Sequence, residues 1–416
     1  MTRPDYGRSV QPRADVRRDN AGLERPRRLA LRGARLFDGH RTWVGRGPGV
    51  LVEGERIVAV FDGDPPRDAD LVDLAGATLL PGLVDAHVHL AFDASPDPVA
   101  ALTGRDDDDA RAAMVKAARV ALRGGVTTVR DLGDRGYLSL DLRGRADLPT
   151  IVAAGPPITT PLGHCHFLGG QVADSADAVR AAVREHADRG CDLVKVMSSG
   201  GAMTPGTRME EAQFARAVLV AAVHEAHRLG LPVTAHAHGS AAIEDCLAAG
   251  VDGMEHVSFW AADGVDDRAD LRQAIADAGI AVGATVGMLS PPLGVTPPPE
   301  VLARLPRMFA NLRDLIERGA VVVAGTDAGI APVKPHDVLR TATAQLGELG
   351  LPPLDALRTV TSIAARVVGL GHRKGRLAPG FDADVLVVDG DPLSDPNAIH
   401  RVRAVYARGQ AVAMTV

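Results

Sequence analysis

The sequence predicts an α/β fold, a (β/α)8 TIM barrel accompanied by a small β-sandwich that is built from both chain ends. Eight short apolar segments alternate with helix-like segments through the middle of the chain, as in a parallel barrel. Strand-like segments broken by Gly, Asp and Pro precede and follow this region. Because chain ends often lie close together in space, we expect the two outer regions to form one domain.

We divide the 416 residues into a leader and two domains. Residues 1–28 contain many arginines together with acids and prolines but no apolar run, so we interpret them as a flexible leader and not as a secretory signal. Residues 29–80 and 372–416 are expected to form the β-sandwich, and residues 81–371 the barrel. No apolar run in the chain is long enough to span a membrane.

The elements of the barrel follow in order from short apolar runs. The predicted strands are VDAHVHL, VTTVRDL, TIVAAG, DLVKVM, PVTAHA, GMEHV, AVGATV and AVVVAGTD. Residues with helical periodicity occur at 110–122, 176–187, 210–228, 241–249, 269–278 and 301–318. The proline-rich SPPLGVTPPPE is typical of a loop and is placed after the seventh strand.

Composition narrows the class of protein. Hydrophobic residues make up 46% and charged residues 24% of the chain, which is ordinary for a globular protein. A net charge of -6 and an aromatic content of 3% argue against nucleic acid or an anionic membrane as the partner. The three cysteines are odd in number and lack zinc-finger spacing, so we expect a cytoplasmic protein without a disulfide framework. We expect a homo-oligomer that acts on a small molecule.

Residues able to bind a metal stand at the ends of the predicted strands. They are His87, His89, Lys195, His236, His256 and Asp327. The carboxyl ends of barrel strands converge on one pocket, so these side chains are expected to meet around metal. The chain contains three His-x-His motifs where about half an occurrence is expected by chance. His87 and His89, two apart on a strand, point to the same side and can hold one cation.

Each of these residues also has a purely structural interpretation. The histidines can be buried groups satisfied by hydrogen bonds. Lys195 lies inside an apolar strand that is covered on both faces, where it can pair with a buried acid or reach solvent from the strand end. Burial also lowers a lysine pKa, and a neutral amine can take up carbon dioxide to become a carbamate that bridges two cations. Asp327 can bind metal and accept a proton from water, or it can cap a helix.

Several segments resemble the amidohydrolase superfamily over nearly all the chain beyond the leader. They are PGLVDAHVHL, GGVTTVRDLG, LVKVMSSGG, VTAHAHG, GMEHV, GTDAG and TSIAARVVGL with KGRLAPGFDADVLVVDGDPL. The resemblance is to the branch of prolidase-like dipeptidases, imidazolonepropionase-like proteins and ochratoxinase-like amidases. It implies two divalent metal ions. The nitrogen and oxygen ligands suit zinc, with manganese, cobalt or iron as alternatives.

The resemblance also implies roles for the individual residues. His87 and His89 would bind one metal, His236 and His256 the other, and a carboxylated Lys195 would bridge them. Asp327 would be both ligand and general base. True imidazolonepropionases generally work with one metal and lack the bridging lysine, which makes their reaction less fitting here.

A third His-x-His motif lies in PLGHCHFLGG, which resembles a Gly-His-Gly segment after the third strand of this branch. The resemblance places His164 next to substrate, although Cys165 replaces the second glycine. A loop histidine without special function is the alternative for His164, and the roles of His166 and His238 stay open.

These implications lead to an expected reaction. The enzyme would cleave the amide C–N bond of a dipeptide or an N-acyl amino acid with metal-activated water, and Asp327 would be the general base. Hydrolysis of a cyclic amide or a lactone at the same metals is the alternative. A barrel that binds metal without catalysis is a further alternative, which the presence of both Lys195 and Asp327 disfavours.

Overall fold

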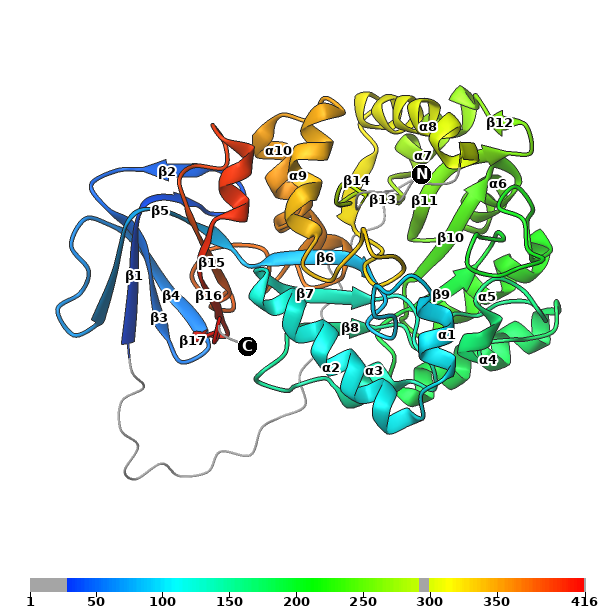
Figure 1. The fold of residues 1–416 in the computed structure, drawn as a ribbon, viewed down its shortest axis with the longest axis horizontal. Coiled ribbons are helices and arrows are strands. Elements are labelled where there is room, and N and C mark those ends of the chain that lie inside the picture. Colours follow the sequence, from blue (N-terminus) through cyan, green and yellow to red (C-terminus); the bar gives the residue numbers. More distant parts are fainter. Residues whose placement is uncertain (1–27, 292–298, 415–416) are drawn as a thin grey trace.

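The computed structural model describes residues 28–291 and 299–414. The predicted leader lies outside these residues except for Arg28, which already begins the first strand. Figure 1 shows a β-rich part formed by the first and last strands, beside a larger part in which strands and helices alternate.

The β-rich part is one mixed sheet of eight strands in the order β17-β16-β15-β5-β1-β3-β4, with β2 paired to β1. Its strands are β1 (Arg28–Phe37), β2 (Thr42–Val44), β3 (Pro48–Glu53), β4 (Arg56–Asp62), β5 (Asp70–Pro81), β15 (Val385–Asp389), β16 (Val402–Ala407) and β17 (Gln410–Ala411). Among the described residues these strands form one hydrogen-bonded sheet, and the finer expectation of a β-sandwich stays a prediction. Because β5 pairs with β1 on one side and with β15 on the other, it joins the strands of both chain ends into a single sheet.

This sheet has an apolar core of its own. Leu31, Val50, Leu79 and Val387 come from four different strands, and all are fully buried in that core. Fully burying such side chains contributes about 1.5–3 kcal/mol each. The contribution of both chain ends to a β-rich part is therefore as expected, while the domain boundaries at 80/81 and 371/372 remain predictions.

The α/β part contains the eight strands expected from the sequence. They are β6 (Leu83–Val88), β7 (Val126–Asp131), β8 (Thr150–Ala153), β9 (Val194–Met197), β10 (Val233–Gly239), β11 (Gly253–Ala261), β13 (Ala281–Thr285) and β14 (Val321–Gly325). All neighbouring strands in this set pair in parallel, and the short β12 (Gly264–Val265) adds an antiparallel hairpin to β11.

The eight strands form two ladders, β6-β7-β8 and β14-β13-β11-β10-β9, in place of the single closed ladder of an ideal barrel. Within the described part of the chain, isolated parallel bridges connect the ladders, Val88 to Ala328 and Ile158 to Val196. The fold is thus a TIM-barrel-like α/β arrangement. Its regular pairing is interrupted where β6 meets β14 and where β8 meets β9.

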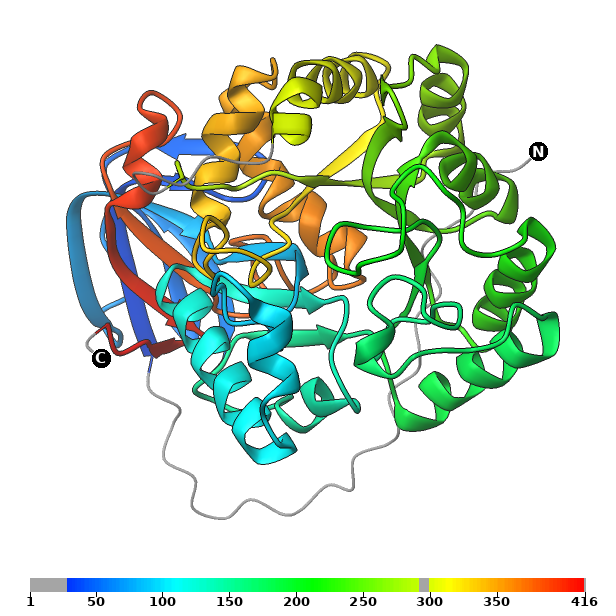
Figure 2. The same cartoon turned by 45° about the vertical axis from the view of Figure 1, so that its right-hand side comes forward.

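Helices surround these strands, as Figure 2 shows from a second direction. They are α1 (Pro98–Thr103), α2 (Asp107–Arg123), α3 (Leu138–Asp141), α4 (Ala176–Arg189), α5 (Arg216–Arg228), α6 (Ser240–Ala249), α7 (Ala269–Ala278), α8 (Pro299–Glu317), α9 (Leu339–Glu348), α10 (Pro353–Thr359), α11 (Ser362–Val367) and two 3-10 turns, His166–Leu168 and Pro396–His400. None of the helices in the described ranges is long and apolar enough to cross a membrane.

Helix α5 begins six residues later than the sequence predicted, at Arg216 and not at residue 210. The preceding residues are held against the end of β9, because the backbone N–H of Gln213 donates to the carbonyl of Ser198 and Ser199 pairs with Ala212. These contacts take backbone groups that a longer helix would need. The predicted helix start was therefore wrong for a tertiary reason.

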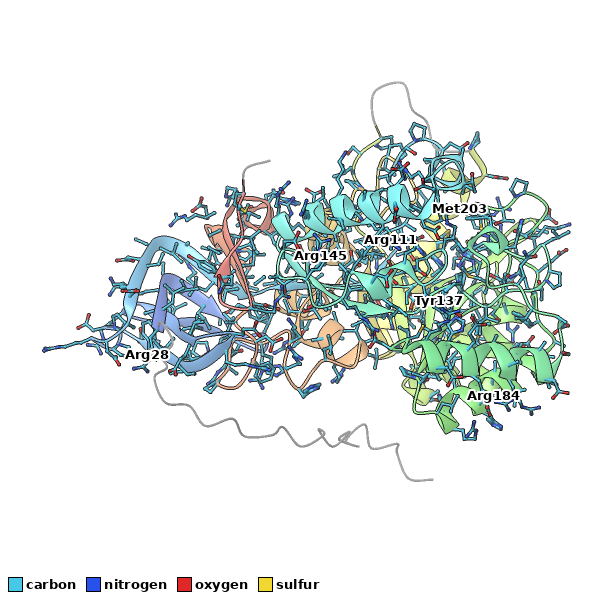
Figure 3. The ribbon with its side chains drawn as sticks, turned by 90° about the horizontal axis from the view of Figure 1, so that it is seen from below. Arg28, Arg111, Tyr137, Arg145, Arg184 and Met203 are labelled. Carbon is cyan, nitrogen blue, oxygen red and sulfur yellow. The ribbon has the colours of Figure 1, made fainter. Side chains whose placement is uncertain are left out.

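Ion pairs tie neighbouring outer helices together. Arg184 of α4 donates to Glu225 of α5 at 2.6 Å, and Arg111 of α2 reaches Asp141 of α3 at 3.2 Å. Figure 3 shows Arg111 and Arg184 on these outer helices. The exposed pair of Arg111 with Asp141 contributes about 0–1 kcal/mol, whereas the carboxylate of Glu225 is buried.

A buried ion pair lies in the segment between α11 and β15. The ammonium of Lys374 is 2.9 Å from Asp382 and also donates to Asp384, and its side chain is 1% exposed. The backbone carbonyl of Asp384 accepts from Gly82, directly before β6. Through Asp384, Lys374 thus helps to fix Gly82, which connects β5 of the β-rich sheet to β6 of the α/β part.

We predict that Lys374→Met destabilises the protein by about 3–5 kcal/mol, because it leaves the buried carboxylate of Asp384 without its cation, while Asp382 keeps its ion pairs with Arg56 and Arg373. Urea unfolding of the variant and the wild type measures this difference. Arg180→Met is the matched control, since it removes one cation from the exposed pair with Asp177 and should cost less than about 1 kcal/mol. Equal stability losses in the two variants would contradict the role of Lys374.

Candidate metal centre

The residues predicted to bind metal lie on strands of the α/β part or just after them. His87 is on β6, Lys195 on β9, His236 on β10 and His256 on β11, and Asp327 follows β14. His89 follows β6 directly. Their side chains are buried or, for His256, half-buried. The fold therefore brings toward one end of the α/β part residues that are far apart in the sequence.

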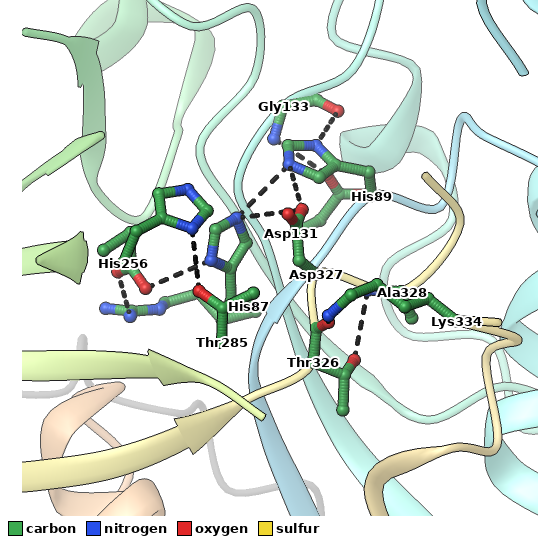
Figure 4. Close-up of polar contacts among 12 residues, drawn as sticks. His87, His89, Asp131, Gly133, His256, Thr285, Thr326, Asp327, Ala328 and Lys334 are labelled. Atoms are coloured by element: carbon green, nitrogen blue, oxygen red, sulfur yellow. Dashed lines mark hydrogen bonds and ion pairs between the residues drawn. The ribbon is translucent and has the colours of Figure 1, made fainter. Parts of the chain in front are cut away.

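Three of these side chains converge on a single point. The Nε2 atoms of His87 and His89 are 3.3 Å apart, and Asp327 Oδ1 lies 3.4 Å from the first and 3.3 Å from the second. Figure 4 shows these contacts around Asp327. Ligands at roughly 2.0–2.1 Å from a tetrahedral zinc ion are roughly 3.3–3.4 Å from one another. The spacing of the three atoms therefore suits one divalent cation.

A second group consists of histidines. The ring of His236 is 4.5 Å from that of His256 and 4.6 Å from that of His238, and nitrogen atoms of all three lie within 4.8 Å of one another. His256 also belongs to a group with His87 and Asp327. Sequence reasoning left the role of His238 open, and the structure places its side chain beside the two predicted ligands.

Three of the four predicted ligand histidines have one ring nitrogen held by a hydrogen bond to the protein. His89 Nδ1 donates to the carbonyl of Gly133 at 3.0 Å, and His236 Nε2 donates to that of Gly200 at 3.1 Å. His256 Nδ1 pairs with the hydroxyl of Thr285 at 2.7 Å. A metal-binding histidine typically uses its second nitrogen in this way, which fixes the ring and the tautomer. The donor set thus fits a divalent metal, with Nδ1 of His236 and Nε2 of the other two as the free atoms.

Lys195 is buried on β9, with 1% of its surface exposed. Its Nζ has no hydrogen-bond partner among the described residues. Burial lowers the pKa of Lys195 to about 8, and the charges of Glu255 and Asp327 limit the decrease. A neutral amine is therefore accessible near neutral pH, which is the form that reacts with carbon dioxide.

Asp327 is ionised throughout the neutral range. Burial alone would raise its pKa, but the charge of His87 and the hydrogen bond and charge of His89 outweigh burial and hold the pKa well below its usual range. The same carboxylate raises the pKa of His89 against the effect of burial. Asp327 can thus act as a ligand and as a proton acceptor.

The backbone is strained at two of the site residues. Asp327 has a φ of 57° and His256 a φ of 72°, a left-handed conformation that few residues other than glycine adopt. Such conformations cost about 1–3 kcal/mol each and persist where surrounding contacts fix them. At Asp327 one of these contacts is the donation of its backbone N–H to the carbonyl of His87 at 2.7 Å.

His164 lies in the loop between β8 and α4 and is buried. Its ring is 4.7 Å from that of His236, and its Nδ1 pairs with the hydroxyl of Thr204 at 3.2 Å. His166 belongs to a 3-10 turn and donates from Nδ1 to the carbonyl of Gly163. Of these two histidines, only His164 is adjacent to the predicted ligands.

Sequence reasoning missed several buried charged residues close to the ligands, among them Asp85, Glu255 and Arg130. Asp85 accepts hydrogen bonds from Thr326, next to Asp327, and burial raises its pKa to about 6. Glu255 lies 3.1 Å from His87 Nδ1 and is paired with Arg130 at 2.8 Å. A charged residue inside an apolar strand was the available signal, as in GMEHV and VTTVRDL.

Comparison with known proteins places this architecture in a family. The model of the amidohydrolase family matches residues 78–412. The chain belongs to the amidohydrolase family. The predicted superfamily is therefore confirmed, as is the prediction of a hydrolase that acts on carbon–nitrogen bonds.

Individual relatives fall in the predicted branch. Ochratoxinase of Aspergillus niger is 28% identical over 363 residues, which cover 79% of this chain and 73% of that protein. Imidazolonepropionase of Salinispora tropica is 25% identical over 367 residues, covering 83% and 86%. The crystal structure of a prolidase complexed with N-methylphosphonate-L-proline matches with a TM-score of 0.79 and 28% identity, covering 92% of this amidohydrolase and 99% of that chain.

We predict that the purified amidohydrolase contains about two divalent ions per chain, because its imidazole and carboxylate groups form two adjacent clusters. Elemental analysis measures this content. Exhaustive chelation should abolish activity, and zinc, manganese or cobalt should restore it. Full activity in the chelated, metal-free protein would contradict the interpretation of these clusters.

We predict that Lys195→Ala loses metal and activity together, since a carbamate of Lys195 would bridge the two clusters. A short carboxylic acid should partly restore both by replacing the missing anion. Lys195→Arg should not be restored, because a guanidinium cannot form the carbamate. An alanine variant with full metal content and near-normal turnover would show that Lys195 is only structural.

Proposed function

We propose that this amidohydrolase cleaves an amide bond of a dipeptide or an N-acyl amino acid at a centre of two divalent cations, with zinc as the expected metal. The observation that carries the proposal is the convergence of His87 Nε2, His89 Nε2 and Asp327 Oδ1 within 3.4 Å. The similarity to a prolidase with a bound N-methylphosphonate-L-proline supports a dipeptide-like substrate.

In this proposal His87 and His89 hold one cation, and His236 and His256 hold the other. Lys195 would be a ligand of both cations as a carbamate, which forms when its neutral amine adds to carbon dioxide with formation of an N–C bond and release of one proton. Bound divalent cations lower the pKa of water and polarise a carbonyl oxygen. The buried Nζ of Lys195, which has no hydrogen-bond partner among the described residues, supports this assignment.

Asp327 is the proposed general base. Its ionised carboxylate accepts a proton from the attacking water and passes it to the leaving nitrogen, which departs as a neutral amine. The contacts with His87 and His89 keep this carboxylate in place before substrate arrives. His164, beside His236, is proposed to contact the substrate.

Hydrolysis of a cyclic amide is a second candidate, supported by the similarity to imidazolonepropionase. Hydrolysis of a lactone, which is a cyclic ester, belongs to the same second candidate. The cytoplasmic location and the homo-oligomeric state remain predictions from the sequence.

The proposal is tested by screening the metal-reconstituted enzyme against dipeptides, N-acyl amino acids, cyclic amides and lactones. The highest kcat/KM is expected for a dipeptide or an N-acyl amino acid. A clear preference for cyclic amides or lactones would replace the proposed substrate class with the second candidate. The absence of turnover in all four classes by fully metallated protein would contradict the proposed function.

We predict that Asp327→Asn lowers turnover by roughly two to four orders of magnitude, because the amide keeps one ligand oxygen but cannot accept the proton. The metal content of the variant is measured beside its rate, so that loss of a ligand is separated from loss of the base. Wild-type turnover by a fully metallated variant would show that Asp327 is not the base.

A further inference from the structure

A buried polar network lies behind His87, on the side of its ring away from Asp327. Glu255 is 1% exposed, and its Oε1 accepts hydrogen bonds from Arg130 at 2.8 Å and from the hydroxyl of Thr234 at 2.7 Å. Arg130 also donates from Nε to the carbonyl of Ala86, the residue before His87. Four strands, β6, β7, β10 and β11, thus meet in one network.

The second oxygen of Glu255 serves His87 alone. Oε2 is 3.1 Å from His87 Nδ1, an ion-pair distance, and neither atom has a hydrogen-bond partner among the described residues. With Oε1 saturated by two donors, the orientation of the carboxylate is fixed. An ionised carboxylate only accepts hydrogen bonds, so its contact favours the tautomer of His87 with the proton on Nδ1.

The neighbouring strand β13 leaves space for Oε2 of Glu255. Gly283 of β13 faces Glu255, and a Cβ built at Gly283 would lie 1.9 Å from Oε2. The backbone of Gly283 is not in the left-handed region, so an alanine could adopt its conformation. The absence of a side chain at Gly283 is thus matched to the position of the carboxylate.

His87 differs from the other predicted ligands in the chemistry of its partner. His89 and His236 donate to backbone carbonyls, and His256 pairs with a hydroxyl. We propose that Glu255 is a positioning residue, which holds the ring of His87 so that Nε2 faces the cation shared with His89 and Asp327. Arg130 and Thr234 hold the carboxylate, and Gly283 admits it.

This inference rests on the proposed metal centre and is tested on zinc binding, independently of activity. Glu255→Gln should raise the dissociation constant of one zinc equivalent by about 10- to 100-fold, since orienting partners of ligand histidines have effects of this size. Competition with a chromophoric chelator measures both equivalents, at a temperature where the metal-free variant is folded.

Gly283→Ala tests the same contact without removing a polar group. The new methyl group should displace the carboxylate and weaken the same zinc equivalent. Asp384→Asn is the matched control, because it disrupts a buried ion pair with Lys374 in the β-rich part. It should lower the temperature of unfolding and leave both zinc dissociation constants unchanged.

The outcomes separate the two proposals. Weakened binding of one equivalent in Glu255→Gln and Gly283→Ala, with none in Asp384→Asn, supports the positioning role. Wild-type zinc affinity in both variants overturns it while leaving the metal centre intact. A wild-type protein that binds no zinc, manganese or cobalt overturns the metal centre and this inference together. If Glu255→Gln does not fold, Gly283→Ala decides.

Discussion

The interior of the α/β part buries charged groups that each need a partner, and this constraint governs the arrangement of the site. Lys195, Glu255, Arg130 and Asp327 are at least nine-tenths buried, and an isolated charge there would cost several kcal/mol. Arg130 neutralises Glu255, and Asp327 faces two imidazoles. Lys195 lacks such a hydrogen-bonded partner among the described residues, which distinguishes it from the structural ion pair of Lys374.

The need of buried polar groups for partners also explains why the rings of the histidines have fixed orientations. A ring with one nitrogen bound by a carbonyl, a hydroxyl or a carboxylate keeps a single free nitrogen in a defined direction. These partners come from loops and strands next to each ligand, such as Gly133 after β7 and Thr285 at the end of β13. The geometry of the centre is therefore set by the sheet and its connections before any ligand enters.

The eight strands could be predicted from the sequence because apolar runs are local signals. The convergence of the four histidines and Asp327 could be predicted as well, because each follows or lies in such a run. The sequence did not reveal the partner of His87, since pairing Glu255 with Arg130 requires the register of strands over a hundred residues apart. The start of α5 was also missed, because contacts with the end of β9 override helical periodicity. The single hydrogen-bonded sheet that joins both chain ends depends on the pairing of β5 with β15, which composition alone does not encode.

The pairing of β5 with β15 has a consequence for folding during synthesis on the ribosome. Pro81 at the end of β5 lies opposite Val385 of β15, so one edge of β5 stays open until roughly 300 further residues have emerged, about 15–60 s at ordinary translation rates. During this time β1, β3, β4 and β5 can pair with one another while an apolar strand edge remains exposed. Until β15 arrives, β5 is thus an unpaired strand edge of the kind that favours aggregation.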